Sequence, residues 1–133
     1  MRIRIYLFPV ILIFLLSLSG CAATYWGSSS IDKPVGATQN TYEPTPMGNI
    51  IITSDDITDR KYEVIGDIVA TVKKPTFFHP DPTRELLNKK FKEEAAAVGA
   101  DAVILVRYGE VGMTLFWWGL LEGKGRAIKF ISE

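Results

Sequence analysis

The sequence predicts a small α+β domain in which an antiparallel or mixed sheet of about four strands packs on one central helix. Three patterns predict it: alternation with period two over residues 62–72, apolar residues at helical spacing over residues 87–98, and an apolar segment at residues 102–106. An apolar leader and a proline-containing stretch come first. We therefore divide the chain into a signal peptide (residues 1–20), a disordered tether (residues 21–49) and the folded domain (residues 50–133).

The leader has the organisation of a bacterial export signal. Arg2 and Arg4 give it a basic start, and residues 5–16 are apolar apart from the Tyr6 hydroxyl. This stretch is shorter than the ~20 apolar residues that a spanning helix requires, which favours cleavage. An uncleaved signal anchor is the alternative, because no charged residue occurs between Arg4 and Asp32.

The only cysteine of the chain follows the leader directly. The segment Leu18-Ser19-Gly20-Cys21 resembles the lipobox of bacterial lipoproteins, whose cysteine is acylated and becomes the first residue of the mature protein. The resemblance implies a diacylglycerol and a palmitate on Cys21, and two or more acyl chains hold a protein firmly in a bilayer. Ala22 in place of an aspartate implies the outer membrane, with the domain facing the periplasm. No cofactor besides this covalent lipid is expected.

Residues 21–49 are expected to be a lipidated, flexible tether. They contain three consecutive serines, three prolines and three glycines but few aliphatic side chains, so they bury too little apolar area to offset the cost of ordering. A flexible coil of this length spans about 30 Å root-mean-square. Tyr25 and Trp26, close to the lipid, suit the headgroup level of a membrane.

The first half of the domain is predicted to contain two strands. Residues 50–53 form a short apolar run of strand type, and residues 55–59 have the composition of a turn. Residues 62–72 alternate with period two, which predicts a long strand with one buried face. The residues assigned to one face are Tyr62, Val64, Gly66, Ile68, Ala70 and Val72.

The second half contains the helix. Asp81 is predicted to cap it, with Pro82 at its first position, and Gly99 to end it in the left-handed conformation. Residues 101–106 are then a central strand, residues 113–121 form the densest apolar run of the mature protein, and residues 125–131 form a last strand. The apolar stripe of the helix is Leu87, Phe91, Ala95 and Val98.

One helix covers only one face of a sheet, so the other face needs a second cover. Residues 115–121 or self-association would supply it, and Phe77 or Phe78 is expected to fill the core. Phe116, Trp117 and Trp118 are also a candidate interaction patch, because tryptophan is enriched in binding sites and at membrane interfaces. Alternatively these rings belong to the core of a small domain.

No motif indicates catalysis, and the protein is not expected to be an enzyme. No serine or cysteine nucleophile has a partner at a telling spacing, and the only histidine, His79, lies in a loop. Structural zinc requires four ligands, so no metal site is predicted around this lone histidine. Removal of residues 1–20 leaves 13 basic and 15 acidic side chains, a net charge of −2 that gives no electrostatic case for binding nucleic acid.

Three segments carry a resemblance to known families: YEVIGDI at residues 62–68, EAAAVGADAVI at residues 94–104, and GRAIKF at residues 125–130. They resemble the YbjQ-like family, often labelled heavy-metal-binding, and the outer-membrane lipoproteins that sense stress for the Rcs phosphorelay. Both resemblances imply a small sheet with one helix. The first implies a pentamer, and the second implies disulfides, for which this chain has no cysteine after Cys21.

We therefore expect a membrane-anchored lipoprotein of the bacterial envelope whose domain is an interaction, scaffold or stress-sensing module. Its expected partners are the bilayer, through the acyl chains, and a protein or a second copy of the chain, through residues 116–118. The family label offers an alternative, a ligand- or metal-binding carrier domain.

Overall fold

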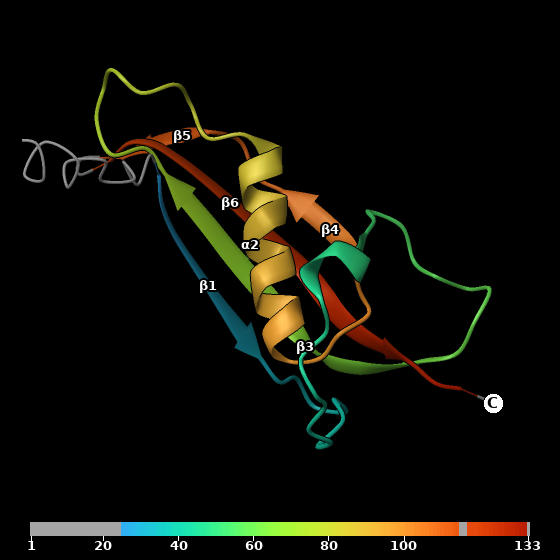
Figure 1. The fold of residues 1–133 in the computed structure, drawn as a ribbon. Helices are drawn as coiled ribbons and strands as arrows, with labels where there is room; N and C mark the ends of the chain where they lie inside the picture. The colour runs from blue at the N-terminus through green and yellow to red at the C-terminus, as the bar shows by residue number, and fades with distance from the viewer. Residues whose placement is uncertain (1–24, 115–116, 133) are drawn as a thin grey trace, which may run out of the picture.

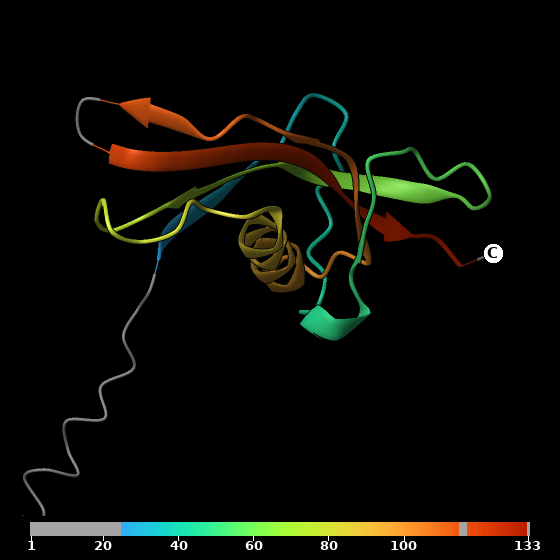
Figure 2. The same cartoon turned by 90° about the horizontal axis from the view of Figure 1, so that it is seen from above.

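A computed structural model describes residues 25–114 and 117–132, which form a six-stranded mixed sheet crossed on one face by one α-helix (Figures 1 and 2). The α+β class and the one central helix are thereby confirmed, and the expected number of about four strands is too low. The helix is α2 (Arg84–Ala97), and a short 3-10 helix, η1 (Met47–Asn49), precedes the second strand. The strands are β1 (Trp26–Asp32), β2 (Ile51–Ile52), β3 (Tyr62–Lys73), β4 (Ala102–Tyr108), β5 (Gly112–Thr114) and β6 (Trp117–Phe130).

The long strands β3 and β6 form the middle of the sheet. The strand order is β1-β3-β6-β4-β2, and β5 pairs with β6 at the end where β6 begins. The short strand β2 runs parallel to β4, whereas the other pairs are antiparallel. Residues 117–121 and 125–130, which the sequence suggested as separate segments, belong to the single strand β6.

Strand β1 shows that the expectation of a disordered tether over residues 21–49 is wrong for much of that range. Trp26–Asp32 pairs with β3 along its whole length, and Ser29 Oγ donates a hydrogen bond of 2.7 Å to Glu94 Oε2 of α2. Farther along, Ala37 is buried and Tyr42 packs against the core. The pairing of β1 depends on backbone hydrogen bonds at a sheet edge, which amino-acid composition does not reveal.

The main core lies between α2 and the sheet. As predicted, Leu87, Phe91 and Ala95 are buried, and Val98 packs against the same cluster. The helix approaches β6 closely at Gly123, where an added Cβ would lie 2.6 Å from Leu87 Cδ2 and 3.1 Å from Phe91 Cζ. The sheet residues in this core are Ile65, Ile68, Ala70, Val72, Val103, Val106, Leu121 and Ala127.

A β-bulge between Val64 and Gly66 divides β3 between two cores, so the prediction of one buried face for this strand is wrong. The bulge adds one residue, and the alternation of side chains therefore changes phase. Tyr62 and Val64 pack in a second, smaller core on the face away from α2, under Ile57 of the preceding loop. The buried members of this second core are Ala102, Ile104 and Ile128.

The second core, rather than residues 115–121, provides part of the cover expected on the face away from α2. Residues 117–121 lie within β6, and Leu121 is buried on the helix side of the sheet. The rest of that face carries both polar and apolar side chains. Arg126 Nε lies 2.7 Å from Asp67 Oδ1 and Arg126 Nη2 3.2 Å from Asp67 Oδ2, and the exposed Leu105 lies beside this ion pair. The second core therefore covers only part of the face away from α2.

The predicted end of α2 is confirmed, whereas its predicted start is wrong. The N-cap is Thr83, whose Oγ1 accepts a 3.4 Å hydrogen bond from the Leu86 N–H, so the predicted cap at Asp81 is wrong. Gly99 ends the helix with φ +73°, as predicted. Besides this left-handed conformation, close packing also requires glycine at position 99, because an added Cβ would clash with the Glu43 carbonyl oxygen. Glu43 belongs to the segment that was expected to be a tether.

Candidate interaction surface

Three parts of the chain that are distant in sequence meet at one end of the sheet (Figure 1). They are the start of β1, the end of β3 with the loop of residues 74–83 that follows it, and the β5–β6 hairpin. The register fixes this arrangement, because Lys73 pairs with Trp26 on one side and Leu120 on the other, and Leu120 pairs in turn with Gly112. Side chains from these segments therefore form a common surface.

This surface is rich in large apolar side chains exposed to solvent, and we call it the aromatic end. Phe77 stacks edge-on against both Phe78 and Trp118, with ring centroids 5.7 Å and 5.4 Å apart. The members of the aromatic end and their exposed fractions are Trp26 58%, Phe77 63%, Phe78 92%, Met113 73% and Trp118 55%. Exposed aromatic side chains gathered in this way mark a contact site more often than scattered ones do.

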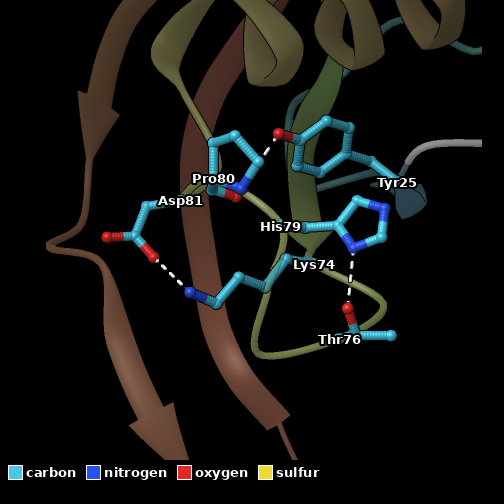
Figure 3. A network of polar contacts seen from close by, with 6 residues as sticks. All are labelled: Tyr25, Lys74, Thr76, His79, Pro80 and Asp81. Atoms are coloured by element: carbon cyan, nitrogen blue, oxygen red, sulfur yellow. Dashed lines mark hydrogen bonds and ion pairs between the residues drawn. The ribbon is translucent and has the colours of Figure 1, made fainter.

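Polar contacts hold the loop that carries Phe77 and Phe78 (Figure 3). The largely buried Lys74 side chain forms a 2.7 Å ion pair with Asp81, which closes the two ends of the loop. Thr76 Oγ1 lies 2.7 Å from His79 Nδ1, and the Tyr25 hydroxyl donates a 3.3 Å hydrogen bond to the Pro80 carbonyl oxygen. With its backbone held in this way, the loop directs its two phenylalanines outward.

These contacts also assign a structural role to His79. Its ring faces the Tyr25 ring edge-on at a centroid distance of 6.5 Å, and its Nδ1 is engaged by Thr76. Across residues 25–114 and 117–132, no group of three or more histidine, cysteine or acidic side chains is arranged to hold a metal ion. Within the same residues, no helix has the length and apolarity needed to cross a membrane.

The cavity between the loop of residues 74–83 and the β5–β6 hairpin is smaller than a typical ligand pocket. It holds about 210 Å³, and its lining includes Phe77, Met113, Trp118, Lys74 and Asp81. Binding pockets for small molecules usually hold about 300–1,000 Å³. The geometry is therefore that of a contact surface rather than of an enclosed site.

The structure describes only some of the residues that were predicted to form the interaction patch. Trp118 lies in the aromatic end, and the backbone of Trp117 begins β6 opposite Thr114. Phe116 lies outside the described residues, as does the lipobox from Leu18 to Cys21. These predictions therefore remain predictions for Phe116 and for the lipidation site.

Sequence reasoning missed the other members of the aromatic end. Phe77 and Phe78 were expected to supply a core residue, but both are exposed. The sequence did contain a signal that these rings are exposed, because they are adjacent in a short loop between Pro75 and Pro80. Such a loop lies at the surface, where few core residues are within reach. No sequence signal connected this loop with Trp26 or Met113, because the sheet register alone brings them together.

No family model matches the chain, and no curated protein matches it. Among solved structures, the chain is similar to a protein of unknown function of the DUF74 family from Pediococcus pentosaceus, at 17% identity and a TM-score of 0.48, over 62% of this chain and 98% of that one. It is also similar to the Francisella virulence factor FvfA, at 14% identity and a TM-score of 0.48, over 77% of this chain and 96% of that one. No function is transferred from either.

Proposed function

We propose that the protein is a lipid-anchored lipoprotein of the bacterial envelope, in the outer membrane and facing the periplasm, and that its domain is an interaction module. The observation that carries this proposal is the position of the aromatic end, which adjoins the start of β1 at Trp26, five residues after Cys21. An acyl anchor at Cys21 and an exposed apolar surface would then lie at the same end of the molecule. Scaffold and stress-sensing roles are narrower forms of this function.

The alternative of a metal- or ligand-binding carrier has less support. It rests on the family label alone, and its most direct test is equilibrium dialysis of the purified protein against transition metals at neutral pH. Stoichiometric binding would favour the carrier over the interaction module.

The anchor is tested by expressing the full chain in a Gram-negative host and measuring the intact mass of the membrane-bound product. We expect loss of residues 1–20 and the added mass of acyl chains, and we expect a Cys21→Ser variant to retain its leader and gain none. A wild-type product that keeps its leader, or that lacks acyl groups, contradicts the proposal.

The interaction module is tested by photo-crosslinking in cells from position 118, with position 35 as the control. Both side chains are exposed, but Val35 follows β1 and so lies at the opposite end of the sheet. We expect adducts, to lipid or to protein, from position 118 and not from position 35. Equal crosslinking from both positions would contradict the proposal that the aromatic end is the interaction surface.

A further inference from the structure

Building on the lipid anchor of the proposed function, we propose that the aromatic end inserts into the interface of the same bilayer that holds Cys21. The domain would then rest with one end of its sheet on the membrane, and the loop that contains Val35 would point away from it. The partner of this surface is therefore lipid, and the contact sets the orientation of the whole domain.

The length of chain between the anchor and the fold limits where the domain can sit. Cys21 and Tyr25 are four residues apart, and four extended residues span at most about 14 Å. Tyr25 contacts His79 and Pro80, so the loop that carries Phe77 and Phe78 lies beside the point where the chain enters the fold. An acylated Cys21 would hold this loop close to the membrane surface.

The chemistry of the aromatic end suits the headgroup region of a bilayer. Tryptophan and tyrosine are enriched at that depth, where a ring is partly in apolar and partly in polar surroundings. The exposed rings of Phe77, Phe78 and Trp118, together with Met113, supply apolar area that would leave water. The carboxylate of Asp81 is neutralised by Lys74, which reduces the cost of bringing this loop near a low-dielectric phase.

The anchor also favours lipid over a protein partner. Because the acyl chains hold the aromatic end beside the bilayer at all times, the contact is intramolecular in effect and needs little intrinsic affinity.

Site-directed spin labelling tests the insertion directly. Cys21 is the only cysteine and would be acylated, so Phe78→Cys or Val35→Cys introduces a single reactive thiol at an exposed site. Each variant is purified in its acylated form, which begins at Cys21 and keeps every residue after it. It is reconstituted into vesicles of phosphatidylethanolamine and phosphatidylglycerol and labelled with a nitroxide. Collision rates with oxygen, which partitions into lipid, and with a water-soluble nickel chelate are then compared. A Met113→Cys variant repeats the measurement from the hairpin.

At positions 78 and 113 we expect a ratio of oxygen to nickel collisions several-fold higher than at position 35. Equal ratios at all three positions, in protein that carries its acyl chains and floats with the vesicles, overturn the insertion and leave the anchor intact. Protection of position 78 from both reagents indicates a protein contact and also overturns it. If the protein carries no acyl chains, the proposed function fails first.

Discussion

Among single residues, Asp101 links the turn after the helix to the end of the central strand β6. Its Oδ1 lies 2.8 Å from Lys129 Nζ, and its Oδ2 accepts a 3.0 Å hydrogen bond from the Phe130 N–H. Asp101 therefore holds the turn after Gly99 against the last residues of β6. The resemblance of residues 94–104 to known families gave no reason for an aspartate at this position.

Replacing Asp101 should therefore cost stability. We expect Asp101→Ala to lower the free energy of unfolding by about 1–3 kcal/mol, because it leaves a half-buried N–H and an ammonium group without their acceptor. Asp101→Asn, which keeps an acceptor for the Phe130 N–H, should cost less. Urea unfolding measures both variants, and an Asp101→Ala midpoint equal to that of the wild type contradicts the role.

Tyr62 provides a test that depends on pH. A hydrogen bond of 2.8 Å to Asp56 raises the pKa of the Tyr62 hydroxyl above its usual value, burial and the charge of Asp56 raise it further, and Arg126 opposes the shift. A pKa raised in the folded state means that the stabilisation is complete below pH ~10 and is lost as pH rises through the folded pKa.

We expect Asp56→Ala to bring the pKa of Tyr62 down toward its usual value and to make folding stability depend less on pH above ~10. Carbon-13 NMR of the tyrosine ring resolves this residue from the other four tyrosines. An unchanged titration of Tyr62 in the variant would show that Asp56 does not control it.

Between elements, the critical contact is the approach of α2 to β6. Gly123 lets Leu87 and Phe91 lie directly on the strand, whereas Gly112 in β5 has open space where a Cβ would be. The two glycines therefore form a matched pair for testing the packing of the helix on the sheet.

We expect Gly123→Ala to destabilise the domain by about 1–3 kcal/mol, because the added methyl group would force the helix or its side chains to shift. Gly112→Ala should change the free energy of unfolding by no more than about 0.5 kcal/mol, as is usual for surface substitutions. Thermal unfolding followed by circular dichroism compares them, and equal losses in the two variants would contradict the close approach.

The pairing of β1 with β3 makes a prediction for amide exchange. In an antiparallel edge strand, alternate amides face the neighbour and are protected, while a flexible tether exchanges throughout. We expect alternate amides between Gly27 and Ile31 to exchange far more slowly than those of the exposed loop around Asp55. Uniformly fast exchange across β1, measured by hydrogen–deuterium exchange NMR, would contradict the pairing and support the expectation of a flexible tether.

For the molecule as a whole, the structure moves the start of the folded domain from residue 50 to β1. The segment of residues 25–49 contributes the edge strand, and Ile31 and Tyr42 pack against the main core. It also covers Gly99 at the end of the helix. Residues 25–49 are therefore part of the fold.

A fragment of residues 50–133 should consequently be much less stable than a fragment of residues 25–133. At about 1 kcal/mol for each lost backbone hydrogen bond, together with the exposed apolar area, we expect a deficit of several kcal/mol. Chemical denaturation of the two fragments measures it, and equal stabilities would return the domain boundary to residue 50.

Local patterns were sufficient for much of the fold. The helix stripe at Leu87, Phe91 and Ala95, the glycine at its end and the long strand at residues 62–72 follow from periodicity and backbone preference, which act over a few residues. The helix start was misplaced because Asp81 and Thr83 are both good caps, and the ion pair with Lys74 engages Asp81.

The sequence by itself determined the α+β class, the one central helix and its apolar stripe, because these depend on the spacing of apolar residues along the chain. It predicted a lipid anchor at Cys21 on equally local grounds. Strand β1, the bulge between Val64 and Gly66, and the gathering of Trp26, Phe77, Met113 and Trp118 emerged with the tertiary structure. These features depend on which strands pair and in what register, and pairing joins residues too far apart for any local pattern to connect.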